Sequence, residues 1–143
     1  MPMSYQISKA MLWSVEVDDK PGAVAEKLQV LADSGADLQF VTGRRVPDQP
    51  GRGVLLVYPI RGKKQEDAAM AAGFTTATEF TALRVEGTNK PGIGNRLTQA
   101  IAEAGINLHE LSAIVTGKKF AAFIAFDTTT EIDKGIKAIR RAS

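Results

Sequence analysis

The sequence predicts an α+β protein in which one βαββαβ unit occurs twice in tandem. The first observation is that Lys20-Pro21-Gly22 recurs 70 residues later as Lys90-Pro91-Gly92, in a chain of 143 residues. The second is that the flanking residues match at the same offset without a gap, as in Val15-Glu16 with Val85-Glu86, Gln29 with Gln99, Ala32 with Ala102, Gly35 with Gly105 and Leu38 with Leu108. The third is that each motif follows a segment of period two, typical of a strand, and precedes a segment of helical period.

The first elements of the chain follow from periodicity and from helix start and stop signals. Residues 4–17 predict a long strand, because Tyr5, Ile7, Met11, Trp13, Val15 and Val17 share one parity. A helix is expected at 21–34, with Asp18 or Asp19 as N-cap, Pro21 in the first turn and Gly35 as the stop.

The other elements repeat this order. We expect strands at 37–46 and 53–60 and a helix at 63–72, and then a strand at 74–87, a helix at 91–104, strands at 106–116 and 119–127, and a helix at 131–142. The units are therefore residues 1–73 and 74–143. Because the second unit ends in a helix and lacks a final strand, we expect residues 4–10 to complete its sheet, with the strands 4–17 and 74–87 running antiparallel and each serving both units.

Composition excludes several classes of protein. The chain has no cysteine, which excludes disulfides and thiolate chemistry, and it has one histidine, His109, which excludes a multi-histidine metal site. The net charge is +2 with scattered lysines and arginines, so no nucleic-acid footprint is apparent. Since there is also no signal peptide and no apolar run of about 20 residues, we expect a cytoplasmic protein without membrane, metal or cofactor.

The two loops between strand and helix are the strongest candidates for a binding site. Backbone N–H groups at a helix start favour an anion, and a glycine lets a ligand approach the backbone closely. Asp19 in the first loop accepts hydrogen bonds only, whereas Asn89 in the second both donates and accepts. A free amino acid needs both kinds of partner, although a single Asp/Asn-x-Pro-Gly segment often only caps a helix.

The segments Asp19-Lys20-Pro21-Gly22-Ala23-Val24 and Asn89-Lys90-Pro91-Gly92-Ile93, each followed by a helix and by Gly-x-Asp/Asn-Leu, resemble the ACT domain family. The resemblance covers nearly the whole chain as two copies. It implies ferredoxin-like βαββαβ units with antiparallel sheets and helices on one face. It also implies a regulatory protein that binds an amino acid or similar metabolite between paired units and acts on an enzyme or regulator in trans. The family's ligand site then maps onto Asp19, Pro21, Gly22, Ala23, Asp37 and Leu38, and onto Asn89, Pro91, Gly92, Ile93, Asn107 and Leu108, with the 89–93 loop as the better candidate.

Other readings of the sequence remain open. An enzyme is not supported, because no nucleophile–base group, metal cluster or phosphate loop is apparent. An RNA-binding or protein-interaction module on the same fold is the alternative, but RNA recognition needs exposed aromatics, and Phe120 to Ile124 reads better as buried. We expect Trp13 in the core, Arg44-Arg45 in solvent, His109 on an edge strand, and Glu16 and Glu86 away from the apolar face. The edge strands 37–46 and 106–116 would allow a homodimer.

Overall fold

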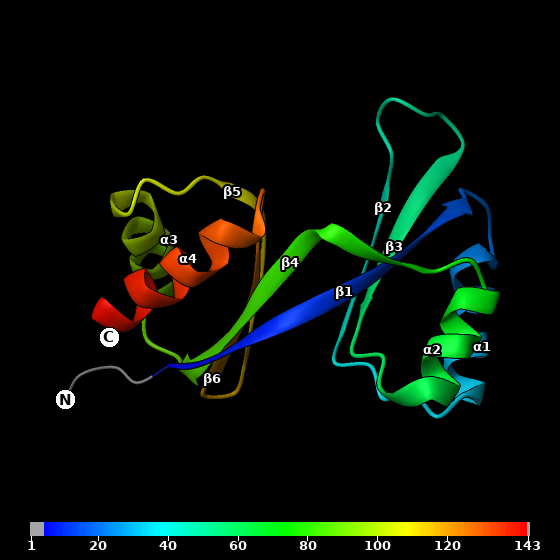
Figure 1. Cartoon of the computed structure of the whole chain (residues 1–143), viewed down its shortest axis with the longest axis horizontal. Coiled ribbons are helices and arrows are strands. Elements are labelled where there is room, and N and C mark those ends of the chain that lie inside the picture. The colour runs from blue at the N-terminus through cyan, green and yellow to red at the C-terminus, as the bar shows by residue number, and fades with distance from the viewer. Residues whose placement is uncertain (1–4, 143) are drawn as a thin grey trace. The chain divides into compact units, whose positions relative to one another are not determined.

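Residues 5–142, the part of the chain that the computed structural model describes, form six strands and four helices (Figure 1). They are β1 (Gln6–Asp18), α1 (Ala23–Asp33), β2 (Phe40–Arg45), β3 (Arg52–Tyr58), α2 (Gly62–Ala71), β4 (Thr75–Thr88), α3 (Ile93–Glu103), β5 (Leu108–Thr116), β6 (Lys119–Phe126) and α4 (Thr129–Arg141). Every predicted element is present, and no boundary differs by more than three residues. The predicted strand start at residue 4 lies outside the described residues, and for 77–81 only the backbone is described.

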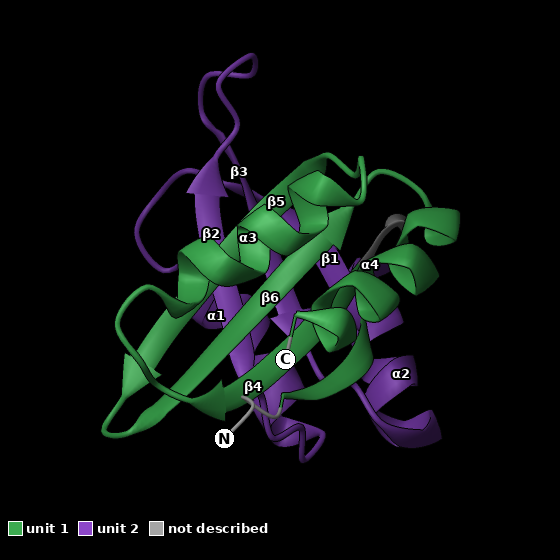
Figure 2. Ribbon diagram, turned by 90° about the vertical axis from the view of Figure 1, so that its left-hand side faces the viewer, with its two compact units in different colours: residues 1–10, 78–143 green, residues 11–77 purple. Residues whose placement is uncertain are grey.

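The chain divides into two compact units that exchange strands (Figure 2). Unit 2 comprises residues 11–77, and unit 1 comprises residues 1–10 and 78–143. The hydrogen-bonded order is β2-β3-β1-β4 in unit 2 and β5-β6-β4-β1 in unit 1, so that residues 75–77 of β4 and residues 6–10 of β1 supply the fourth strands. Both orders are those of a βαββαβ unit, with antiparallel pairing of β1 with β3, β2 with β3, β4 with β6 and β5 with β6. The predicted fold class is confirmed.

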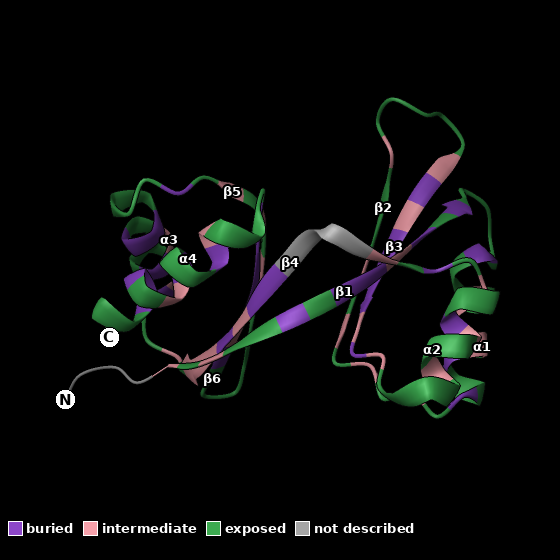
Figure 3. Cartoon of the chain, viewed as in Figure 1, coloured by how far each residue is buried: buried purple, intermediate pink, exposed green. Residues whose placement is uncertain are grey.

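Each unit has its own hydrophobic core between its helices and one face of its sheet (Figure 3). In unit 2 this core consists of Trp13, Val15, Val17, Ala23, Leu31, Leu55, Val57, Ala69 and Phe74. In unit 1 it consists of Leu83, Val85, Ile93, Leu97, Ile101, Ile106, Phe120, Ala122, Ile124, Phe126, Ile132 and Ile139. The expected burial of Trp13 is confirmed, since only 7% of its surface is exposed. Each large side chain buried in this way contributes about 1.5–3 kcal/mol to stability.

The first described residues of the chain contribute to the core of unit 1. Tyr5 and Ile7 pack against the cluster that contains Leu83 and Val85 on β4. Residues of β1 and β4 that are more than 70 positions apart therefore belong to the same unit. The second repeat, which has only three strands of its own, gains its fourth strand in this way.

The single-parity prediction for β1 is wrong at Met11, which is 59% exposed. Ala10 and Leu12, on the other parity, are 0% and 2% exposed, and Trp13 returns to the predicted parity. The alternation rule assumes one buried face, but β1 buries both parities where it passes from unit 1 into unit 2 after Ala10.

Candidate functional site

The Lys-Pro-Gly segments form the same tight turn in both units. Gly22 has φ 87° and ψ −13°, and Gly92 has φ 83° and ψ 6°, the conformation of the third residue of a type II turn. The turn closes when the amides of Ala23 and Ile93 donate to the carbonyls of Lys20 and Lys90, at 3.3 and 3.1 Å. The positive φ favours glycine at these two positions, and Pro at the second residue supplies the other half of the turn.

The helix caps differ from the prediction. Gly22 is the N-cap of α1 and Gly92 that of α3, and neither helix has a side-chain cap. The expectation that Asp18 or Asp19 caps α1, with Pro21 inside its first turn, is wrong. The type II turn inserts three residues between the aspartate and the helix, so the carboxylate cannot reach the first helical amides.

At both helix starts, one amide has no backbone acceptor among the described residues. The first helical bonds run from Glu26 and Arg96 to the carbonyls of Gly22 and Gly92, at 2.9 and 3.0 Å. Among residues 5–142, no backbone carbonyl accepts from the amide of Val24, and the same holds for its counterpart Gly94. These N–H groups lie at the positive end of a helix dipole and can bind a carboxylate.

The loop of residues 19–23 is tied to the end of β2 by an ion pair. Arg45 donates from Nε to Oδ2 of Asp19 at 2.8 Å, and 83% of the Arg45 side chain is exposed. The expected exposure of the Arg44-Arg45 pair is therefore confirmed for Arg45, but its specific contact with Asp19 was not predicted.

Next to this ion pair, Arg52 bridges the ends of two strands. Arg52 donates to Asp18 on β1 at 2.6 Å and to Glu16 at 3.2 Å. The hydrogen bonds that Arg52 donates to Glu16 and, with a smaller effect, to Asp18 raise the pKa of its guanidinium above the ordinary value. The end of unit 2 that carries the 19–23 loop is therefore a network of alternating charges.

A pocket of about 270 Å³ lies at this end of unit 2. It is lined by Val17, Asp18, Asp19, Lys20, Val24, Gly43, Arg44, Arg45, Gly53 and Val54. Two of these lining residues are glycines on strands, Gly43 on β2 and Gly53 on β3. Gly53 stands opposite Val17 on β1 and opposite Arg45 on β2, and a Cβ on Gly53 would come within 3.1 Å of the Arg44 carbonyl oxygen. Glycine inside a strand is a sequence signal for such a close approach.

The 89–93 loop of unit 1 has different neighbours. In the matching row of its sheet, Gly87 on β4 stands opposite Phe120 on β6, which in turn stands opposite Val115 on β5. Phe120 is 4% exposed and fills the core where unit 2 has Gly53, and Val115 replaces Arg45. A pocket of about 260 Å³ also lies at the end of β4, but it is lined by Gln6, Glu86, Gly87, Thr88 and Lys119 and by no residue of the 89–93 loop. The arginine and a pocket lined by loop residues therefore accompany the 19–23 loop, whereas the sequence had favoured the 89–93 loop.

The strand-start residues lie at the other end of each helix. Leu38 packs against the core of unit 2 and Leu108 against that of unit 1, while Asp37 and Asn107 are exposed. The 11 residues of α1 separate Asp37 from the 19–23 loop by about 16 Å at 1.5 Å per residue. Within unit 2 the structure does not bring these predicted site residues together, and their role in ligand binding stays a prediction.

The remaining polar candidates form local contacts. His109 Nδ1 lies 3.0 Å from Oδ1 of Asp127 on the exposed edge of unit 1, next to a β-bulge at Leu108/Glu110. Glu86 pairs with Arg84 on the same strand. Within residues 5–142, no group of three His, Asp or Glu side chains is arranged to hold a metal ion, and no helix is long and apolar enough to cross a membrane.

The ACT domain family model matches residues 81–142, which confirms the family resemblance for that segment. A protein of Bacteroides thetaiotaomicron has a similar structure, with a TM-score of 0.76, 17% identity, and coverage of 96% of this chain and 89% of that one. The regulatory subunit of aspartate kinase from Thermus thermophilus is also similar, with a TM-score of 0.66, 14% identity, and coverage of 99% and 97%. The corresponding subunit from Thermus flavus has a TM-score of 0.62, 16% identity and the same coverage. No curated protein matches the chain in sequence.

Proposed function

We propose that this chain, in which residues 81–142 form an ACT domain, is a regulatory protein that binds a small molecule, an amino acid, in the pocket beside the 19–23 loop. The observation that carries the proposal is the combination in one place of an open helix start, a paired aspartate and arginine, and a pocket. The fold shared with regulatory subunits of aspartate kinase supports a regulatory role.

The groups around the pocket suit a zwitterion. The ligand's carboxylate would accept from the amide of Val24 at the start of α1, where the helix dipole favours negative charge. Its ammonium group would donate to Asp19, whose carboxylate Arg45 holds at the pocket. The Val17 and Val24 side chains leave an apolar wall for a small aliphatic side chain.

The size of the pocket also points to a small ligand. Its volume of about 270 Å³ lies just below the usual range of about 300–1,000 Å³ for small-molecule sites. A nucleotide would not fit, whereas a single amino acid would. We therefore expect the pocket to select amino acids by the size of the ligand's side chain, because Gly43 and Gly53 leave only limited space beside it.

The alternative of an RNA-binding module receives less support from the positions of the aromatic side chains. Base stacking needs aromatic rings exposed on the central strands. Trp13, Phe120, Phe123 and Phe126, on β1 and β6, are each at most 8% exposed. A small-molecule role accounts better for the polar groups gathered around the 19–23 loop.

We also propose that two copies pair through β5, the edge strand of unit 1. Leu111, Ile114 and Val115 on this strand are 45%, 65% and 48% exposed, which is unusual for three apolar residues on one short strand. An edge strand presents unpaired backbone groups that a second copy can satisfy by extending the sheet.

A thermal-shift screen of the twenty amino acids tests the function. An amino acid present at 100 times its dissociation constant should add about 2.7 kcal/mol to the free energy of unfolding. The stabilisation should disappear in Asp19→Ala and persist in Asn89→Ala, the matched change in the other loop. If no amino acid stabilises the protein, or if Asn89→Ala removes the effect and Asp19→Ala does not, the proposed site is wrong.

A further inference from the structure

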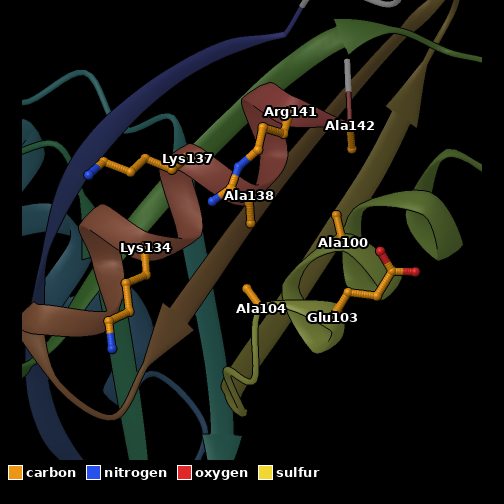
Figure 4. A pocket seen from close by; sticks show the side chains of 8 residues that line it. All are labelled: Ala100, Glu103, Ala104, Lys134, Lys137, Ala138, Arg141 and Ala142. Atoms are coloured by element: carbon orange, nitrogen blue, oxygen red, sulfur yellow. The ribbon is translucent and has the colours of Figure 1, made fainter.

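A second cavity lies between α3 and α4 of unit 1 and has a volume of about 560 Å³ (Figure 4). We call it the α3–α4 groove. It is lined by Ala100, Glu103, Ala104, Lys134, Lys137, Ala138, Arg141 and Ala142. Figure 4 shows the alanine methyl groups between the two helices, the three cationic side chains on α4 and Glu103 on α3. The ligand pocket proposed above belongs to unit 2, so this groove is a separate feature.

The charges around the α3–α4 groove are unbalanced. Lys134, Lys137 and Arg141 stand against one carboxylate, that of Glu103. Among the described residues, no carboxylate forms an ion pair with any of these three cations. The groove therefore presents net positive charge that no part of the described chain neutralises.

The acidic residues of α4 are directed to other partners. Asp133 lies 3.2 Å from the ammonium group of Lys9, and Glu131 accepts a hydrogen bond from the Thr128 hydroxyl at 3.2 Å. The acidic residues of α4 therefore have partners outside the groove, whereas its cationic residues line the groove. A solvated helix surface of mixed charge would not be divided in this way.

The shape of the groove suits a helix. Its floor is made of alanines, so another helix can approach closely, and interaxial distances of about 8–10 Å depend on such small contact residues. Lys134 and Arg141 are seven residues apart on α4, or about 10 Å at 1.5 Å per residue. Carboxylates at positions i and i+7 of an approaching helix have the same spacing.

In unit 2, the counterpart of α3 lacks the alanines that line the groove. The residues 70 positions before Ala100, Glu103 and Ala104 are Val30, Asp33 and Ser34. Asp33 accepts a hydrogen bond from Gln29, and the Ser34 hydroxyl is buried and donates to the Leu31 carbonyl. The alanines that line the α3 side of the groove are therefore not repeated on α1.

We propose that the α3–α4 groove docks an acidic amphipathic helix of a partner protein. The alanines would receive the apolar side of that helix, and Lys134 and Arg141 would pair with carboxylates on its flank. A compact anion such as phosphate fits less well, because it would leave the alanines of the groove without an apolar partner. Docking of the helix does not depend on the proposed amino-acid binding. Only an effect of the bound amino acid on this docking would rest on the proposed function.

The test uses the full chain, without amino acid, and a synthetic helical peptide as probe. The peptide carries leucines along one side and glutamates at i, i+3 and i+7 beside them, and binding is followed by the backbone amide signals in NMR spectra. We expect shifts concentrated on residues 100–104 and 134–142. Lys134→Glu should weaken binding about tenfold, while Lys64→Glu, the same charge change on α2, should leave binding unchanged.

A shape variant and two further probes separate the alternatives. Ala104→Leu, at an exposed helix end, should weaken peptide binding and leave the binding of tripolyphosphate unchanged. A scrambled peptide of equal charge should bind at least several-fold more weakly. The proposal is overturned if the scrambled peptide binds equally well, if tripolyphosphate gives the same shifts with tighter binding, or if the shifts fall outside the groove. The spectra of the variants also report whether each one remains folded.

Discussion

Arg45 donates a hydrogen bond from its Nε to Oδ2 of Asp19, at 2.8 Å, and so joins the end of β2 to the loop that precedes α1. The two side chains are 83% and 39% exposed, and an ion pair so open to solvent contributes at most about 1 kcal/mol to stability. What the contact does is orient the Asp19 carboxylate at the pocket of unit 2. If Arg45 has this role, its removal should weaken ligand binding more than it lowers the free energy of unfolding.

Arg45→Ala should lower the free energy of unfolding by less than about 1 kcal/mol, because the ion pair is exposed. It should weaken ligand binding more than this, since Asp19 loses its fixed orientation. Urea unfolding with and without the amino acid identified by the screen measures both effects. The matched control is Lys63→Ala, which removes the exposed 2.7 Å pair with Asp67 on α2 and should change stability by a similar amount without changing binding. Equal effects of the two variants on binding would contradict this role of Arg45.

Gly22→Ala should destabilise the protein by about 1–2 kcal/mol, because an L-residue at φ 87° is strained even where space is free. Gly92→Ala should do the same at φ 83°. Gly94 provides the control, since it lies inside α3 with no neighbour within 4 Å of an added Cβ, and its φ is not positive. Gly94→Ala should stabilise the protein by about 0.5–1 kcal/mol.

Urea unfolding curves of the three glycine variants measure these differences. A stabilising effect of Gly22→Ala, or equal effects of Gly92→Ala and Gly94→Ala, would contradict the type II turn at the start of the helices. Because the substitution is the same in all three, the side-chain contribution cancels in the comparison.

The sequence predicted the elements well because the repeat supplied each of them twice. Trp13, Val15 and Val17 alternate on β1, and the Lys-Pro-Gly turn marks the start of each helix, so strand and helix could be distinguished from local pattern alone. The strand exchange could also be anticipated, since a βαββαβ unit that ends in α4 lacks a strand that residues 6–10 can supply.

The site was less accessible from sequence because it depends on which residues meet across strands. That Gly53 stands opposite Val17 follows from the pairing register of β1 and β3, which the sequence does not give. That Phe120 takes the place of Gly53 in unit 1 becomes clear only when the shorter β5–β6 hairpin is aligned with the β2–β3 hairpin. The contact between Arg45 and Asp19 spans 26 residues. The two glycines within predicted strands, Gly43 and Gly53, were the available signal, and they do mark the pocket.

Tyr5 makes the position of the first strand testable by pH. Burial raises the pKa of the Tyr5 phenol above its ordinary value of 10.0, and the nearby positive charge of Arg96 partly offsets this. The folded state therefore holds the proton more tightly than the unfolded state. The stability that depends on this group is fully present below about pH 10 and is lost as the pH rises through the pKa of the folded state.

Urea unfolding at about pH 9 and about pH 11 should show a loss of stability in the wild type that is smaller in Tyr5→Phe, which has no phenol to ionise. The same loss in both proteins would mean that Tyr5 does not pack against the core of unit 1.

Val115→Lys should weaken self-association through β5. The substitution places a charge at a 48% exposed edge position, where it disfavours the approach of a second sheet edge. Sedimentation of the wild type should show a dimer that the variant converts to a monomer, while Val41→Lys on β2, 45% exposed in the wild type, should leave the dimer intact. A monomeric wild type, or a dimer that only Val41→Lys disrupts, would exclude pairing through β5.

The central claim is that the pocket beside the 19–23 loop binds an amino acid, and Gly43→Val tests it most directly. An added Cβ at Gly43 meets only ordinary contacts, at 3.8 Å from Leu55 Cδ1 and 3.9 Å from the Val54 oxygen, and we expect the valine side chain to occupy the pocket. Ala113→Val, 70 residues later on β5, is the matched control. In isothermal titration calorimetry with the stabilising amino acid, we predict that Gly43→Val abolishes binding and Ala113→Val retains it. Wild-type affinity in Gly43→Val, or loss of binding in Ala113→Val alone, would contradict the account.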